Sequence, residues 1–84
     1  MDDITFEYEG ETHALEEHPP RDGADKVLSV ETATVYAEAL LFADDSYRVV
    51  VTMNALPQEQ EDRREIEAQI EEQLQERGLT ERNQ

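Results

Sequence analysis

The spacing of apolar residues changes once along this chain, and that change constrains the fold most. Before Pro57, the apolar side chains of residues 4–8 and 46–53 recur largely at every second position, which is typical of a half-buried β-strand. After Pro57 the spacing becomes four residues, which is typical of one face of an α-helix. Three large apolar residues follow this spacing: Ile66, Ile70 and Leu74. The sequence therefore predicts strands followed by one C-terminal helix, an α+β domain.

The predicted domain contains four antiparallel strands, of which the first two form a hairpin over residues 4–15. Gly10 suits its turn because a positive φ costs glycine little. A two-residue turn at residues 9–10 places Phe6 opposite His13. Residues 16–25 include two prolines and a glycine, so we expect a loop there.

The third and fourth strands are expected within residues 26–43 and 46–55, which are rich in β-branched and aromatic side chains. A two-residue turn at residues 44–45 sets a register that turns Glu38 toward the apolar face of the strand pair. Burying an unpaired carboxylate costs several kcal/mol or more. We therefore expect a β-bulge or a strand break near residues 37–39.

The C-terminal helix is expected over residues 57–77, packed on one face of the sheet. Pro57 suits its first turn, where a missing N–H is no loss, and Gly78 suits the position just after its end. These elements form a single domain over residues 1–78. Residues 79–84 are expected to fray as a C-terminal tail.

Three large apolar residues on the helix are too few to cover a four-stranded sheet. In the expected register, the second face of the sheet carries a further set of apolar residues: Val35, Ala37, Ala39, Leu41 and Val50. We therefore expect a homodimer, unless the sheet curls on itself within one chain. The interaction surface is expected on this second face or on an open strand edge, because both readily accept another chain.

Charge is distributed along the whole chain, with 22 Asp or Glu residues against seven Lys or Arg and a formal net charge of −15. At molar salt the screening length falls to roughly 3 Å, so that repulsion among these carboxylates weakens. The excess of carboxylate, the single lysine and the 37% hydrophobic content resemble the composition of small haloarchaeal proteins. That resemblance implies a cytoplasm rich in KCl and names no activity.

Several classes of function and location are not expected. The chain has no cysteine, so thiolate chemistry is excluded. Its apolar runs are too short to span a membrane, and its acidic first 18 residues lack the apolar segment of a secretory signal. No basic stripe is present to displace counterions from nucleic-acid phosphates. We expect a cytoplasmic protein that binds neither membranes nor nucleic-acid phosphate.

The sequence contains no pattern that indicates catalysis or a bound cofactor. His13 and His18 lie among glutamates, a composition that can bind a divalent metal, but their spacing matches no metal signature. Residues 21–25 have too few carboxylates for a calcium loop. Neither Ser29 nor Ser46 lies in a nucleophile motif. We expect no catalytic, cofactor-binding or metal-binding residues, and no enzyme activity.

The leading hypothesis is a protein-interaction or regulatory module without catalysis, binding itself and an unidentified protein partner. A second hypothesis is a small-ligand or metal-binding protein with a cleft between His13 and the proline-containing loop. A third is an acidic mimic of nucleic acid, whose helix carboxylates dock on a basic partner.

Overall fold

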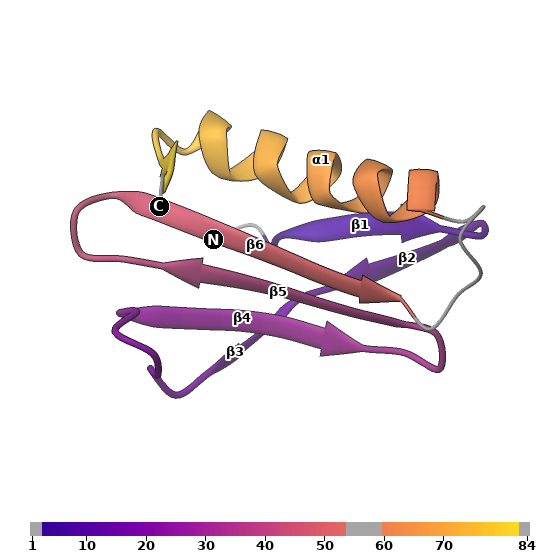
Figure 1. The fold of residues 1–84 in the computed structure, drawn as a ribbon, viewed down its shortest axis with the longest axis horizontal. Coiled ribbons are helices and arrows are strands. Elements are labelled where there is room, and N and C mark those ends of the chain that lie inside the picture. Colours follow the sequence, from indigo (N-terminus) through magenta and orange to yellow (C-terminus); the bar gives the residue numbers. More distant parts are fainter. Residues whose placement is uncertain (1–2, 54–59, 83–84) are drawn as a thin grey trace.

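The computed structural model describes residues 3–53 and 60–82, drawn as a ribbon in Figure 1. Within these residues the elements are β1 (Thr5–Tyr8), β2 (Glu11–Ala14), β3 (Glu16–His18), β4 (Lys26–Glu31), β5 (Val35–Leu41), β6 (Ser46–Met53), α1 (Gln60–Glu76) and β7 (Thr80–Glu81). β1 and β2 form a two-stranded sheet. The other strands form a five-stranded sheet in the order β3-β4-β5-β6-β7.

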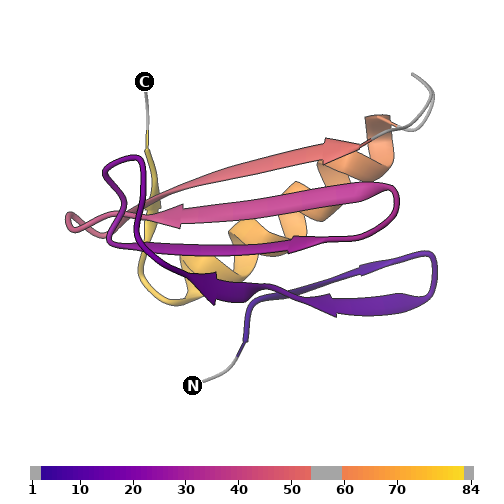
Figure 2. The ribbon, with the colours of Figure 1, turned by 90° about the horizontal axis from the view of Figure 1, so that it is seen from below.

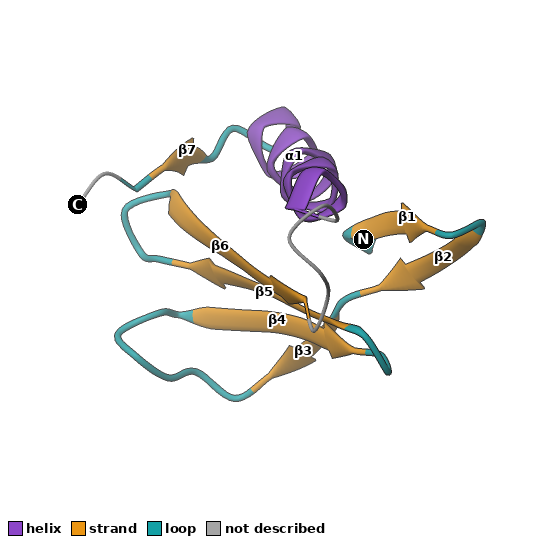
Figure 3. Ribbon diagram, turned by 45° about the vertical axis from the view of Figure 1, so that its right-hand side comes forward, coloured by secondary structure: helices purple, strands orange, loops and turns teal. Residues whose placement is uncertain are grey.

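The predicted α+β class is confirmed, because one helix packs on a mainly antiparallel sheet. The predicted strand number was wrong: the main sheet has five strands rather than four, and its last pair, β6 and β7, is parallel. Figure 3 shows α1 and the β1–β2 hairpin on the same side of this sheet. The main sheet is therefore one layer, and the helix and hairpin together form the other.

The β1–β2 hairpin has the predicted turn and register. Glu9 and Gly10 both have positive φ, 52° and 79°, as a two-residue type I′ turn requires. Phe6 pairs with His13 across the two strands, and their rings lie 5.2 Å apart.

Two departures from the expected strands occur before β5. β3 forms inside the predicted loop, where Glu16 pairs with Ser29 and His18 with Val27. The chain then turns at residues 32–34, whereas β5 runs without interruption through residues 37–39. The predicted bulge or break at residues 37–39 was therefore wrong, and Glu38 continues the strand as a buried residue.

The turn between β5 and β6 is one residue longer than expected, and this reverses the faces of β5, whereas β6 keeps Tyr47, Val49 and Val51 on the side of α1. Leu41 pairs with Tyr47 and Glu38 with Val50. Phe42 N–H also donates to Ser46 C=O, so the turn consists of residues 43–45. Asp45 takes a positive φ of 64°, as the last residue of a three-residue hairpin turn commonly does. A shift of one residue moves every side chain of a strand to its other face. The odd-numbered residues of β5 therefore join the odd-numbered residues of β6 on the side of α1.

The C-terminal end of α1 is a Schellman cap, as Gly78 predicts. Leu79 N–H donates to Leu74 C=O, and Gly78 N–H donates to Gln75 C=O, with Gly78 at φ 86°. The helix begins at Gln60 in the described structure, and residues 57–59 of the predicted helix lie outside the described residues.

The predicted frayed tail is ordered as far as Arg82. Thr80 N–H donates to Asp45 C=O, and Arg82 N–H donates to Tyr47 C=O, so this segment joins the sheet as β7. The Arg82 guanidinium lies 4.1 Å from the centre of the Phe42 ring. Backbone pairing and this cation–π contact supply the order that the local sequence does not indicate.

The main core lies between α1, the hairpin and the odd-numbered face of the sheet. Its largest fully buried members are Tyr47, Phe6, Ile4, Ile66, Ile70, Leu74 and Val35. The hairpin supplies Ile4 and Phe6, and Leu15 follows directly after β2. These side chains cover the part of the sheet that α1 leaves open, so the shortage of helix side chains no longer requires a second subunit.

Helix side chains also occupy the outer edge of β1. The Gln73 amide accepts from Thr5 N–H at 3.0 Å and donates to Thr5 C=O, and Gln69 does the same for Glu7 at 2.8 and 3.1 Å. Each side-chain amide thus forms the two backbone hydrogen bonds that a neighbouring strand would form with that residue of β1. Two glutamines one helical turn apart match two outward-facing residues of β1, because both spacings are about 6 Å.

Replacing Gln73 by alanine is expected to lower the free energy of unfolding by about 1–2 kcal/mol, since two backbone groups of Thr5 lose their partners. Amide hydrogen exchange at Thr5 should accelerate more than exchange in β5. Glu72→Ala, on the exposed face of α1, is the matched control and should change neither. Unaltered exchange at Thr5 in the Gln73 variant would mean that the amide does not hold this edge.

Candidate interaction site

The outer edge of β6 is covered along only part of its length. β7 pairs with Ser46 and Tyr47 alone. Among residues 3–53 and 60–82, no strand lies beside β6 on this side after Tyr47. Figure 2 shows β6 continuing beyond the short β7. The uncovered stretch, residues 49–53, is defined here as the β6 edge.

The direction of the backbone groups along the β6 edge follows from the pairing before it. Tyr47 C=O accepts from Arg82 N–H in β7, whereas Ser46 C=O accepts from Phe42 N–H on the β5 side. Backbone groups alternate along a strand. Val49 and Val51 therefore direct both N–H and C=O outward, away from β5. No described residue forms a hydrogen bond with these outward groups.

A row of helix side chains lies above the β6 edge. α1 packs on β6 and runs in the opposite direction, at an oblique angle that brings its first turns nearest to β6 (Figures 1 and 2). Gln75 donates to the Tyr47 hydroxyl at 2.8 Å, which fixes this side of the helix over the start of β6. One and two turns before Gln75 lie Glu71 and Glu67, and Arg63 forms a 2.5 Å ion pair with Glu67. Carboxylates thus border the β6 edge on its helix side.

Glu71 is the carboxylate whose environment disfavours ionisation. Partial burial raises its pKa above the ordinary value, and the negative charges of Glu81 and Glu67 raise it further. A raised carboxyl pKa means that the folded state binds the proton more tightly than the unfolded state. The ionised Glu71 therefore lowers stability at pH values above its folded pKa, and this loss vanishes at pH values below the unfolded pKa.

Glu71→Gln is expected to stabilise the protein at pH 7 and to have almost no effect near pH 3.5. Urea unfolding of both proteins at the two pH values measures this difference. Glu72→Gln removes the same charge from the exposed side of α1 and should show a smaller pH-dependent gain. Equal gains for the two variants would assign the effect to net charge rather than to the position of Glu71.

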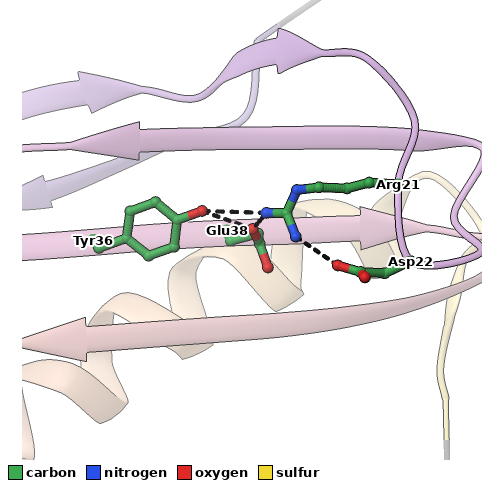
Figure 4. Close-up of polar contacts among 4 residues, drawn as sticks. All are labelled: Arg21, Asp22, Tyr36 and Glu38. Carbon is green, nitrogen blue, oxygen red and sulfur yellow. Dashed lines mark hydrogen bonds and ion pairs between the residues drawn. The ribbon is translucent and has the colours of Figure 1, made fainter.

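The opposite face of the sheet carries a polar cluster at its centre, shown in Figure 4. Glu38 is only 7% exposed, and the Arg21 guanidinium forms an ion pair with it. The Tyr36 hydroxyl donates to Glu38 Oε1 at 2.7 Å, and Asp22 binds the other side of the guanidinium at 2.6 Å. The buried carboxylate is therefore both paired and hydrogen-bonded, as burial of a charge requires.

The Arg21–Glu38 pair holds the loop after β3 across this face. Ala24 packs with Val27 and Leu40 in a second apolar cluster, and Asp25 N–H donates to Leu41 C=O. Part of the face opposite α1 is thus covered by the protein's own loop. This arrangement makes the covered part of the face unavailable as a contact surface.

The predicted interaction residues do not form one surface. Val35, Ala37 and Ala39 lie in the main core and are at most 2% exposed, and Leu41 is half-buried beside that core. Val50 lies on the opposite face, paired with Glu38. The expected surface does not form because the longer β5–β6 turn brings the β5 residues of the set to the side of α1, whereas Val50 stays on the face opposite α1.

The residues considered for a metal or ligand site lie apart. His13 is in the hairpin against Phe6, whereas His18 is exposed in β3, directly before the proline-containing loop. A shallow hollow beside His13 is lined by the hairpin and residues 32–34, not by that loop. Among the described residues, no group of three or more His, Asp or Glu side chains is placed to hold a metal. No described helix is long and apolar enough to cross a membrane.

Comparison with known proteins adds no relative. No protein-family model matches the chain, and no curated protein or solved structure matches it.

Sequence reasoning anticipated an open strand edge but did not locate it on β6. The residues of this site that the sequence analysis missed are Glu67 and Glu71, which lie four residues apart on one side of α1. Their spacing was the available signal, since it marks one continuous side of the helix. The strand that lies beneath this side of α1 depends on how the helix packs on the sheet, and the sequence pattern does not specify that packing.

Proposed function

We propose that this protein is a small, cytoplasmic, non-catalytic module that binds another polypeptide along its β6 edge. The observation that carries the proposal is the outward-facing backbone of Val49 and Val51, which no described residue pairs. An open edge with β-branched residues is a template for a further strand. Backbone hydrogen bonds then supply affinity, and alternate side chains supply selectivity.

The contrast between β6 and the outer edges of β1 and β3 supports this choice. Gln69 and Gln73 occupy the outer edge of β1. β3 is three residues long, carries two glutamates and is followed by prolines. Short strands, charges and prolines all discourage pairing. The β6 edge lacks these features, because residues 49–53 contain no charge and no proline.

The proposal is tested by titrating the ¹⁵N-labelled protein with an eight-residue peptide of alternating glutamine and valine. Binding by strand addition should slow amide exchange at Val49 and Val51 and leave β3 amides unchanged. Val51→Pro removes an outward N–H, a position where an edge strand tolerates proline, and should abolish the protection. A circular dichroism spectrum equal to the parent's establishes that this variant is folded. Unaltered exchange at both valines at millimolar peptide would contradict the proposal.

A homodimer is the second candidate, and the backbone of β6 favours it. Two copies of the β6 edge can pair antiparallel about a two-fold axis at Val51, so that each supplies the other's missing strand. Sedimentation should then show a dimer that Val51→Pro converts to a monomer. A monomeric parent protein at 0.5 mM in 2 M KCl would remove this candidate.

We further propose that the acidic composition adapts the protein to high salt. The formal charge of −15 opposes compaction where screening is weak. Circular dichroism is expected to report increasing helix and sheet content as KCl rises from about 0.05 M to about 3 M. A spectrum that is already native at the lowest salt would contradict this adaptation.

A further inference from the structure

We propose that the β6 edge selects an extended polypeptide segment with basic and apolar residues in alternation. The inference rests on the proposed function and specifies the chemistry of the partner. A strand added to this edge would present alternate side chains to the two sides of the sheet, and these two sides carry different charges.

The helix side of the β6 edge is negative. Glu71 and Glu67 lie on the side of α1 that faces β6, and Glu81 of β7 is close enough to raise the pKa of Glu71. Arg63 pairs with Glu67, so Glu71 is the carboxylate in this row with no ion pair to a described cation. A cation placed here would relieve repulsion that the folded chain already carries.

The spacing of these carboxylates matches that of a strand. Residues four apart on a helix are separated by about 6 Å along its axis, and every second side chain of a strand by about 6.6 Å. α1 runs obliquely in the direction opposite to β6 (Figures 1 and 2), and Gln75 donates to the Tyr47 hydroxyl. Glu71 and Glu67 therefore follow in step with Val49 and Val51, the two residues that would pair with the added strand.

The opposite side of the β6 edge favours apolar side chains. The residues of β6 on that face are Arg48, Val50 and Thr52, of which Arg48 is exposed and Val50 half-buried. A cation on this side would meet the positive charge of Arg48, whereas an apolar side chain would pack beside Val50. The two sides together select one orientation, with basic residues toward α1.

The same charges argue against a second copy of this chain as the preferred occupant. A β6–β6 pair would join the sheets of two chains, each of net charge −15. It would bring Glu67 and Glu71 of one chain toward the same residues of the other. Like charges placed across an interface oppose association. A basic segment gains from the same field that a second copy must overcome.

The test uses three eight-residue peptides that alternate valine with lysine, glutamine or glutamate. Their dissociation constants for the full chain are measured by the slowing of exchange at Val49 and Val51, in 2 M KCl and in the lowest KCl concentration at which circular dichroism shows the same fold. We expect the lysine peptide to bind about tenfold more tightly than the glutamine peptide, and the glutamate peptide to bind most weakly. The preference should shrink at 2 M KCl.

Two matched variants assign the preference to its position. Glu71→Gln should reduce the lysine-to-glutamine ratio to about twofold, whereas Glu72→Gln makes the same charge change on the exposed side of α1 and should preserve it. Equal binding of all three peptides would overturn the inference and leave strand addition standing. Binding of none would overturn the proposed function itself. A lysine preference equally reduced by both variants would overturn the assignment to the β6 edge.

Discussion

Replacing Ile70 by alanine is expected to lower the free energy of unfolding by about 3 kcal/mol. Ile70 is fully buried at the centre of the apolar stripe of α1. Truncation removes buried methyl and methylene groups and leaves a cavity between the helix, the hairpin and β6. A domain of this size has a stability of only about 5–10 kcal/mol, so this single change removes a large share of it.

Urea unfolding in 2 M KCl measures this loss through the transition midpoint at an unchanged slope. Ala68 is exposed on α1, and Ala68→Ser is the matched control, expected to change stability by less than about 0.5 kcal/mol. A loss below about 1 kcal/mol for Ile70→Ala would show that α1 does not pack on the sheet through this stripe.

Replacing Arg21 by alanine is expected to cost about 2 kcal/mol, because it leaves the buried Glu38 without its cation. The value lies below that for a fully buried pair, since the Arg21 side chain is 46% exposed and Tyr36 still donates to the carboxylate. The loop that carries Ala24 should also loosen, and amide exchange at Asp25 should accelerate.

A double-mutant cycle separates the pair from its surroundings. Glu38→Gln keeps an acceptor for the Tyr36 hydroxyl and removes the charge, so adding Arg21→Ala to it should cost much less than in the parent protein. Asp22→Asn, on the exposed partner of Arg21, serves as the surface control. Additive losses in the cycle would mean that the ion pair contributes nothing to the buried site.

Glu38 is a residue whose burial was expected to be avoided, although the means by which the protein accommodates it was not predicted. Its inward position among apolar residues indicated that a buried carboxylate had to be avoided or paired. We expected a bulge, but the structure provides a cation from a loop 17 positions earlier in the chain. That expectation rested on a register that placed Glu38 on the side of α1, whereas the structure places it on the opposite face, beneath the loop after β3. The choice of Arg21 among six arginines could not be read from the pattern, since it depends on where this loop crosses the sheet.

The β5–β6 turn shows why a small local error has a large effect. Both a two-residue and a three-residue turn suit the segment Ala43-Asp44-Asp45. The three-residue turn was selected because it places Val35, Ala37 and Ala39 against α1 and the hairpin. Since strand faces alternate with a period of two, one extra residue in the turn reversed the faces of β5 relative to β6.

Local sequence signals were sufficient to predict the β1–β2 hairpin with its Glu9–Gly10 turn, the apolar stripe of α1 and the helix cap at Gly78. These depend on backbone preferences and on spacings within a few residues. The β5–β6 register, the strands β3 and β7, and the uncovered β6 edge became clear from the folded chain alone. Each depends on which distant segments compete for the same backbone groups and the same buried surface, and a linear pattern does not record that competition.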